Sequence, residues 1–437
     1  MKLFDFLSVF IQGLDKAGIA HCVLRNYDGL PHENPGNDID ILVSPNNIES
    51  ALSILRGINH VIVTGILRRA YVVSTFISGI EWGHNRHAIE IDFVFLLGWK
   101  GIPYLPVNEV LYRAQYISNS DGLLKKPDAC HEALISFLSS YLVGGWIKEK
   151  YQPLVQEIFR MDRQKIGLLL CDIMSQKTAT VLAEAVINDD RKRVIGLLPK
   201  IKRHLLLTRL GSKPLHSLRA ILTHFILELK IRITPYPIDT VCFLGPDGSG
   251  KSTVISEVIA RLEGTTKEIA CYHLKPNFTK QKGIPIPVID PHAKPPRSMI
   301  LSAGKIVYWL LLYWYNMIFH GYKNLTLRIW DRYYYDLLID PKRYRYGAPI
   351  WFAKFIGKLM PKPDLFILLD APPEVLQSRK REVSTEETSK QRTAYLQYIQ
   401  KQKTAAIVDA SQPLPQVFLD TNEVLLKFLA QRAASRL

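Results

Sequence analysis

Cysteine is scarce in this sequence: five residues, Cys22, Cys130, Cys171, Cys242 and Cys271, are spread over 437 positions. Their number is odd and no Cys-x-x-Cys pair occurs, so the sequence supports neither a disulfide framework nor a cysteine zinc site. Cys22 and Cys242 fall in apolar, strand-like runs, where we expect them to act as small buried side chains. These features predict a protein of the reducing cytoplasm.

Long uninterrupted apolar runs are also missing. The N-terminal segment carries Asp5 and Asp15 within its apolar pattern and lacks a small-residue cleavage site, so it predicts an amphipathic helix and not a signal peptide. Residues 299–318 are the most apolar stretch, but polar residues such as Asn316 interrupt it, whereas a membrane-spanning helix needs about 20 apolar residues. We expect this stretch either to be a buried or groove-lining helix or to lie at a membrane surface as a peripheral contact.

Negative charge is in deficit, because 56 Lys and Arg residues face 40 Asp and Glu residues, for a formal net charge of +16. Such an excess favours anionic partners: nucleotides, phosphorylated glycans or an acidic membrane surface. No run of Lys and Arg reaches the length of a nucleic-acid-binding tail, so no specific nucleic-acid partner is expected.

The chain is too long for one compact core, and its pattern changes twice. Residues 1–125 alternate helical and strand-like runs, which predicts a small α/β domain with a mixed sheet. Residues 126–234 carry apolar side chains at three- and four-residue spacing, which predicts a helical region. The Pro-Tyr-Pro sequence at 235–237 marks a boundary. Residues 235–437 then predict an α/β domain with a parallel sheet covered by helices on both faces.

Residues 245–253, GPDGSGKST, fit the phosphate-binding pattern G-x-x-x-x-G-K-[ST] between an apolar strand and a helix. The glycines allow a tight turn, so that backbone N–H groups point at phosphate oxygens. Lys251 adds positive charge for the terminal phosphates of a nucleotide such as ATP, and Ser252 offers a hydroxyl to Mg²⁺. The expected nucleotide contacts are Gly245, Asp247, Gly248, Ser249, Gly250, Lys251, Ser252 and Thr253.

Three later segments carry further charged residues at strand and helix ends. An apolar run ends in Asp331-Arg332, where the acid can hold Mg²⁺ through water or accept the substrate's proton, and the arginine can clamp a phosphate. The buried strand expected at 364–370 is followed by a helix that delivers cations suited to a lid. These cations are Arg379 and Arg381, with Arg392 further on. Residues 417–420 are expected to form a last short strand.

Together these segments resemble the thymidylate kinase branch of the P-loop nucleoside monophosphate kinases, over about residues 239–437 and in that family's order. The resemblance implies Mg²⁺-dependent transfer of the γ-phosphoryl group of ATP to dTMP or a related monophosphate. It also implies that Asp247 contacts the nucleotide sugar, Asp331 lies near the metal and Arg332 holds the acceptor phosphate. The family's loop arginine is absent, which implies that Arg379, Arg381 and Arg392 supply the catalytic charge from the lid.

The acceptor side departs from that family. A proline-rich stretch and the aromatic helix at 299–318 replace the usual acceptor-binding segment. Because aromatic faces pack on sugars and apolar chains, a sugar or glycolipid acceptor in cell-surface polysaccharide synthesis is an alternative. A third hypothesis is a non-catalytic nucleotide-sensing module. The oligomeric state stays open.

Near the N-terminus, Asp38 and Asp40 alternate on one expected strand and Asp92 lies on a later one. Alternate positions project from the same face, and carboxylates brought together repel unless a divalent cation joins them. This pattern resembles the nucleotidyltransferase superfamily, in which a glycine-containing turn precedes Asp-x-Asp. The turn here is Gly36-Asn37, with asparagine in the usual serine position. The resemblance implies either a second, metal-dependent nucleotidyltransferase activity or a degenerate domain that only binds.

Overall fold

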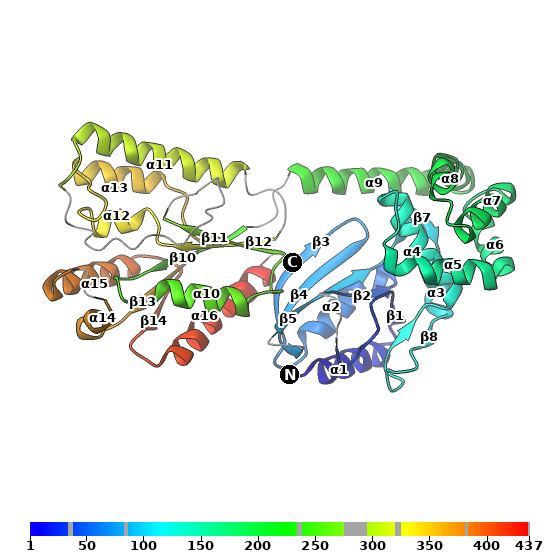
Figure 1. The fold of residues 1–437 in the computed structure, drawn as a ribbon, viewed down its shortest axis with the longest axis horizontal. Helices are drawn as coiled ribbons and strands as arrows, with labels where there is room; N and C mark the ends of the chain where they lie inside the picture. Colours follow the sequence, from blue (N-terminus) through cyan, green and yellow to red (C-terminus); the bar gives the residue numbers. More distant parts are fainter. Residues whose placement is uncertain are drawn as a thin grey trace. The chain divides into compact units, whose positions relative to one another are not determined.

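The computed structural model describes residues 1–33, 38–82, 86–233, 238–274, 295–319, 325–380 and 383–435. The chain forms two compact units, Met1–Ile233 and Thr234–Leu437 (Figure 1). The further division of the first unit between residues 125 and 126 stays a prediction. In the part of the chain described, no helix is long and apolar enough to cross a membrane.

The first unit is built on a mixed five-stranded sheet in the order β1-β2-β5-β4-β3. β2 (Asp38–Val43) and β5 (Arg86–Val94) are parallel neighbours, and the other pairings are antiparallel. The remaining strands of this sheet are β1 (His21–Val23), β3 (Ile62–Arg68) and β4 (Val72–Trp82).

Alternation along β2 divides the first unit into two hydrophobic cores. Ile39, Ile41 and Val43 pack with α1 (Leu3–Lys16) and α2 (Ile48–Arg56) on one face. Leu42 packs on the other face with the helical region that begins at α4. Asp38 and Asp40 share the parity of Leu42 and therefore project toward that second face. The remaining strands and α-helices of the first unit are β6 (Leu97–Trp99), β7 (Ile102–Leu105), α3 (Val107–Tyr112), β8 (Gln115–Tyr116), β9 (Lys125–Lys126), α4 (Ala129–Val143), α5 (Gln152–Met161), α6 (Arg163–Cys171), α7 (Gln176–Ile187), α8 (Arg191–Ser212) and α9 (Pro214–Ile233).

The second unit contains a five-stranded sheet in the order β11-β12-β10-β13-β14, with every pairing parallel. Its strands are β10 (Ile238–Leu244), β11 (Glu268–His273), β12 (Thr326–Asp331), β13 (Leu365–Asp370) and β14 (Ala405–Asp409). β10 lies at the centre, so the loop that leaves its carboxyl end lies beside the ends of β12 and β13. The expected parallel sheet is confirmed.

The strands of this sheet are buried on both faces. Val241 and Phe243 pack with α10 (Lys251–Arg261) and α16 (Leu414–Ala434), whereas Cys242 and Leu244 pack with α11 (Met299–Phe319) on the opposite face. The other helices of the unit are α12 (Tyr335–Ile339), α13 (Ile350–Leu359), α14 (Pro373–Arg379) and α15 (Thr385–Ile399).

The expected strand at residues 417–420 is wrong. These residues lie in α16, where Val417 and Thr421 are buried one helical turn apart. The fifth strand is β14 instead, a few residues earlier. A short apolar run carries no periodicity that distinguishes a strand from a buried helical turn.

Candidate functional sites

The phosphate-binding loop joins β10 to α10 and requires glycine at defined positions. Gly245, Gly248 and Gly250 have φ values of +149°, +84° and +82°, which other residues rarely adopt. A Cβ atom at Gly248 would lie 2.7 Å from the carbonyl oxygen of Leu376. A side chain is therefore excluded there, and the backbone itself lines the pocket.

Lys251 begins α10 and folds back over the loop. Its Nζ donates to the carbonyl oxygens of Gly245 and Pro246, each at 2.8 Å, and to Ser249 Oγ at 3.2 Å. Burial, with the nearby charge of Arg332, lowers the pKa of Lys251 to about 8. The buried ammonium group of Lys251 is thus held by uncharged oxygen atoms. The negatively charged oxygens of a bound phosphate can replace these acceptors and form stronger, charge-assisted hydrogen bonds.

Asp331, at the end of β12, lies beside the first turn of α10. Ser252 Oγ donates to Asp331 Oδ2 at 3.2 Å, and His273 Nδ1 lies 3.3 Å from the same oxygen. Burial alone would raise the pKa of Asp331, but the His273 hydrogen bond and the charge of Lys251 outweigh it and lower that pKa. Among the described residues, Asp331 Oδ1 is buried without a hydrogen-bond partner. An ionised carboxylate beside a serine hydroxyl fits Mg²⁺, which takes oxygen ligands.

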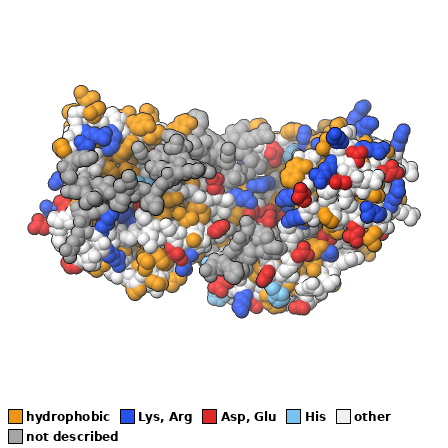
Figure 2. Space-filling model, in the orientation of Figure 1, with side chains coloured by type: hydrophobic (Ala, Val, Ile, Leu, Met, Phe, Trp, Pro, Cys, Tyr) orange, Lys and Arg blue, Asp and Glu red, His pale blue; other side chains and the backbone are white. Residues whose placement is uncertain are grey.

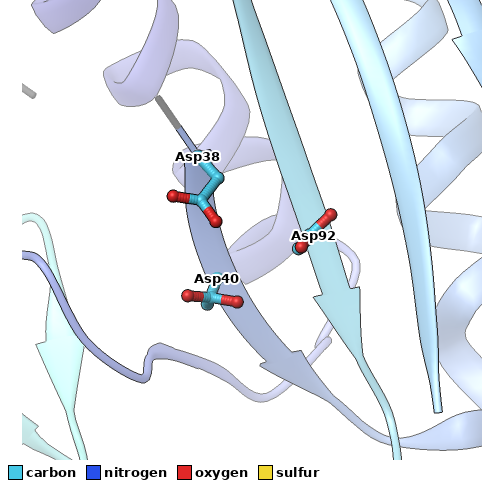
Figure 3. A group of neighbouring side chains, drawn as sticks. All are labelled: Asp38, Asp40 and Asp92. Carbon is cyan, nitrogen blue, oxygen red and sulfur yellow. The ribbon is translucent and has the colours of Figure 1, made fainter. Parts of the chain in front are cut away.

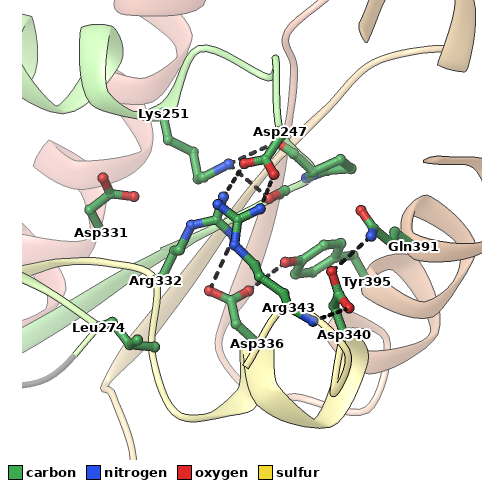
Figure 4. Close-up of polar contacts among 12 residues, drawn as sticks. Asp247, Lys251, Leu274, Asp331, Arg332, Asp336, Asp340, Arg343, Gln391 and Tyr395 are labelled. Carbon is green, nitrogen blue, oxygen red and sulfur yellow. Dashed lines mark hydrogen bonds and ion pairs between the residues drawn. The ribbon is translucent and has the colours of Figure 1, made fainter. Parts of the chain in front are cut away.

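Asp247, in the loop, is the point at which two arginines converge (Figure 4). Arg332 Nη2 and Arg343 Nη1 each donate to one oxygen of the Asp247 carboxylate. Arg332 is buried and has a positive φ of +69°, a conformation unusual for a residue with a side chain. Both Arg332 and Arg343 line the pocket.

Buried carboxylates behind this cluster hold the arginines in place. Asp336 Oδ2 lies 3.7 Å from Arg332 Nη1, and Asp336 Oδ1 accepts a hydrogen bond from the hydroxyl of Tyr395. Asp340 accepts from the backbone N–H of Arg343 at 3.0 Å and from Gln391 at 2.9 Å. Burial raises the pKa of Asp336, although Arg332 and Tyr395 oppose this shift.

The three lid cations have different positions. Arg379 ends α14, lines the pocket and donates from Nη1 to the carbonyl oxygen of Ala410 at 2.8 Å. Arg392 forms a two-bond ion pair with Asp370, with both N–O distances at 2.8 Å, and is not among the pocket-lining residues. Arg381 lies outside the described residues.

These groups surround one pocket of about 410 Å³. Sequence reasoning named Asp247, Lys251 and Asp331 but not His273, which reaches the pocket from the end of β11. Only the sheet order places β11 next to β12, so no local signal identified this histidine. The complete lining is Asp247, Gly248, Gly250, Lys251, Ser252, Thr253, His273, Asp331, Arg332, Arg343, Arg379 and Lys380.

A separate cluster of carboxylates lies in the first unit (Figure 3). Asp38 and Asp40 on β2 and Asp92 on β5 bring one oxygen each to within 4.8 Å of one another. The strands are parallel, with Asp40 paired to Asp92. The three acids therefore lie on one face of adjacent strands. Gly36 and Asn37, the turn before β2, lie outside the described residues.

The charge of this cluster is only partly balanced. Arg25 Nε lies 2.5 Å from Asp40 Oδ2. Burial raises the pKa of Asp92 to about 6, helped by the neighbouring carboxylates and opposed by Ser74. Asp92 Oδ1 is buried without a hydrogen-bond partner among the described residues. Oxygen ligands in this arrangement fit a divalent cation such as Mg²⁺.

A pocket of about 290 Å³ opens beside Asp40 and Asp92, between the sheet and α4. Ser136, Ser139 and Ser140 line it from one face of α4. Tyrosine and arginine side chains complete the polar part of its wall: Arg25, Arg69, Tyr71, Tyr104 and Tyr151. The pocket can thus take a polar ligand next to the carboxylates.

Comparison with known proteins relates the chain to nucleotide kinases. No protein-family profile matches it. A probable thymidylate kinase from Pyrobaculum aerophilum is 26% identical over 206 residues, which cover 42% of this chain and 95% of that protein. The chain therefore contains a thymidylate kinase-like region, which supports a nucleotide kinase kind of function.

Proposed function

We propose that the Thr234–Leu437 unit is a Mg²⁺-dependent kinase that transfers the γ-phosphoryl group of ATP to dTMP or a related monophosphate. The observation that carries the proposal is the pocket of about 410 Å³ where the phosphate-binding loop, Asp331 and a group of arginines meet. The similarity to a probable thymidylate kinase supports chemistry of this kind.

On the donor side, the loop backbone and Lys251 bind the β- and γ-phosphates, and Lys251 exchanges its carbonyl partners for phosphate oxygens. Ser252 and Asp331 are the residues that would hold Mg²⁺. When bound, the ion offsets charge on the β- and γ-phosphate oxygens. Arg379, which lines the pocket, would stabilise charge on the transferring group.

On the acceptor side, Arg332 and Arg343 favour a phosphorylated substrate. Both arginines line the pocket, and arginine binds a phosphate monoester through two parallel hydrogen bonds. A monoester oxygen is already ionised, so its attack on the γ-phosphorus needs no general base. A hydroxyl acceptor would need one.

The aromatic helix α11 gives no support to a sugar acceptor in this pocket. Both aromatic side chains are buried in the core, Trp309 against Tyr344 and Tyr313 against Trp330 and Tyr333. Neither Trp309 nor Tyr313 is among the residues that line the pocket. The phosphorylated acceptor is therefore the better-supported substrate class.

The proposal is tested by measuring ADP formation with dTMP, other nucleoside monophosphates and sugar phosphates as acceptors. Lys251→Ala should lower kcat by about 100- to 1000-fold, because a preorganised charge on the transferring phosphate is lost. Lys427→Ala, on the exposed face of α16, is the matched control and should keep full turnover. Nucleotide binding without turnover on every acceptor would contradict the kinase assignment and favour a sensing module.

We also propose that the first unit catalyses metal-dependent nucleotidyl transfer. The specific observation is the convergence of Asp38, Asp40 and Asp92 beside a pocket that has serine, tyrosine and arginine side chains in its wall. Such a site would hold Mg²⁺, which activates a nucleotide's phosphate for attack. Asp40→Asn should weaken Mn²⁺ binding about tenfold or more, measured by electron paramagnetic resonance. The exposed Asp121→Asn is the control. Equal affinity in the two variants would remove the basis for this second activity.

A further inference from the structure

Helix α11 is apolar on its exposed side as well as on its buried side. The buried stripe follows the helical repeat at Ser302, Ile306, Trp309, Tyr313 and Asn316. A surface helix ordinarily carries polar residues on its outer face. The outer face of α11 instead exposes Ile300, Leu301, Val307, Tyr308, Leu311, Trp314, Tyr315, Met317 and Ile318.

Helix α13 extends this exposed surface. The two helices pack against each other, and Trp314 Nε1 donates to the carbonyl oxygen of Leu359 at 2.9 Å. α13 adds four large exposed side chains, Ile350, Trp351, Phe355 and Leu359. We call the exposed apolar side chains of α11 and α13 the apolar platform. Figure 2 shows hydrophobic side chains along the edge where Figure 1 places α11.

The size and composition of the apolar platform distinguish it from scattered surface leucines. Trp351 is 66% exposed and Leu311 is 63% exposed, although the opposite side of α11 is firmly packed in the core. Contiguous exposed apolar patches of this kind mark interaction sites. Trp and Tyr in particular are suited to a boundary that is apolar on one side and wet on the other.

The charged side chains of the described segments that contain α11 and α13, residues 295–319 and 346–363, have one sign. Arg297, Lys354, Lys358 and Lys362 are exposed at its margins. Residues 295–319 and 346–363 contain no Asp or Glu. Anionic lipid headgroups attract such cations, while the long Lys stems accompany the apolar side chains into the interface.

We propose that the apolar platform docks on the surface of an anionic lipid bilayer. α11 would lie in the interface with its outer face among the headgroups and upper acyl chains. A symmetric contact with a second copy would bring the same cations into apposition, which disfavours that occupant. The proposal is independent of the kinase assignment, because the side chains of the apolar platform do not line the phosphate-binding pocket.

The test is cosedimentation of the full chain with vesicles of phosphatidylcholine alone or of phosphatidylcholine mixed with phosphatidylglycerol. The expected result is sedimentation with the mixed vesicles that weakens as salt is added. The double variant Leu311→Ser/Trp351→Ser should reduce the bound fraction at least tenfold, and Lys354→Glu/Lys358→Glu should do the same.

A matched control comes from α9, where Leu215 and Leu222 are 83% and 61% exposed. Leu215→Ser/Leu222→Ser should leave vesicle binding unchanged. Circular dichroism and thermal denaturation of every variant verify that the second unit is folded. Failure of the unaltered chain to bind mixed vesicles, or equal binding by the platform variants, would overturn the proposal. So would a dimer in sedimentation velocity that the platform variants dissociate, because a second copy would then be the occupant.

Discussion

Several functional side chains have properties that their residue type alone would not give. Lys251 is buried and Asp331 is partly buried, and the pKa values of both are lowered for different reasons. The pKa of Lys251 is lowered to about 8 because desolvation dominates, whereas that of Asp331 is lowered because His273 and Lys251 stabilise its ionised form. Each shift has a measurable consequence.

ATP binding should take up protons above pH 8. Lys251 is largely neutral there in the empty loop, since its pKa is about 8, and phosphate oxygens favour the charged ammonium. Titration calorimetry in buffers of different ionisation enthalpy measures the number of protons exchanged. At pH 9 the protein should take up a fraction of a proton for each nucleotide bound. At pH 6 Lys251 should take up none, because it is already charged. Equal exchange at both values would show that Lys251 does not titrate on binding.

Metal binding at the N-terminal carboxylates should strengthen as the pH rises through about 6, because Asp92 must ionise. The pKa of Asp92 is higher in the folded protein than in the unfolded chain. Protonation of Asp92 therefore stabilises the metal-free folded protein, and this stabilisation is lost as the pH rises through about 6. Mn²⁺ affinity measured between pH 5 and 7.5 should show the transition. Asp92→Asn should lack it, and retention of the same profile in that variant would assign the titration to another group.

At the level of elements, the phosphate-binding loop depends on backbone that only glycine adopts without strain. Gly248→Ala places a methyl group 2.7 Å from the Leu376 carbonyl at a positive φ, so the loop must shift. We expect ATP affinity to fall about tenfold, and the free energy of unfolding to fall by about 1 kcal/mol or more. Nucleotide titration and urea denaturation measure both quantities.

Gly196→Ala serves as the control for that substitution. Gly196 lies within α8, and a Cβ atom there meets nothing within 4 Å. Alanine in a helix interior should stabilise the chain by about 0.5–1 kcal/mol and leave nucleotide binding unchanged. If both variants gave the same change in ATP affinity, the steric argument about the loop would be wrong.

At the scale of the whole molecule, each unit has its own sheet and its own hydrophobic cores. Two calorimetric unfolding transitions are therefore expected. ATP with Mg²⁺ should raise the midpoint temperature of only one transition, because a ligand stabilises the unit that binds it. At an ATP concentration of 100 times Kd, the free energy of unfolding of that unit should rise by about 2.7 kcal/mol. Lys251→Ala should remove most of this shift. A single transition in which nucleotide stabilises the entire chain would show that the units unfold together.

The sequence alone determined the features that depend on near neighbours in the chain. The phosphate-binding loop was recognisable because glycine positions, Lys251 and Ser252 act within a few residues of one another. The alternation of side chains along β2 also depends only on near neighbours, and it placed Asp38 and Asp40 on one face of the strand. The error at residues 417–420 arose where a short apolar run had no such local signal.

Only the tertiary structure decided which distant residues meet. Sheet order brought His273 to Asp331, and chain folding brought Arg343 to Asp247. Chain folding also paired Arg392 with Asp370 and left the outer face of α11 exposed. These outcomes depend on contacts between residues far apart in sequence, which local propensity and spacing do not encode.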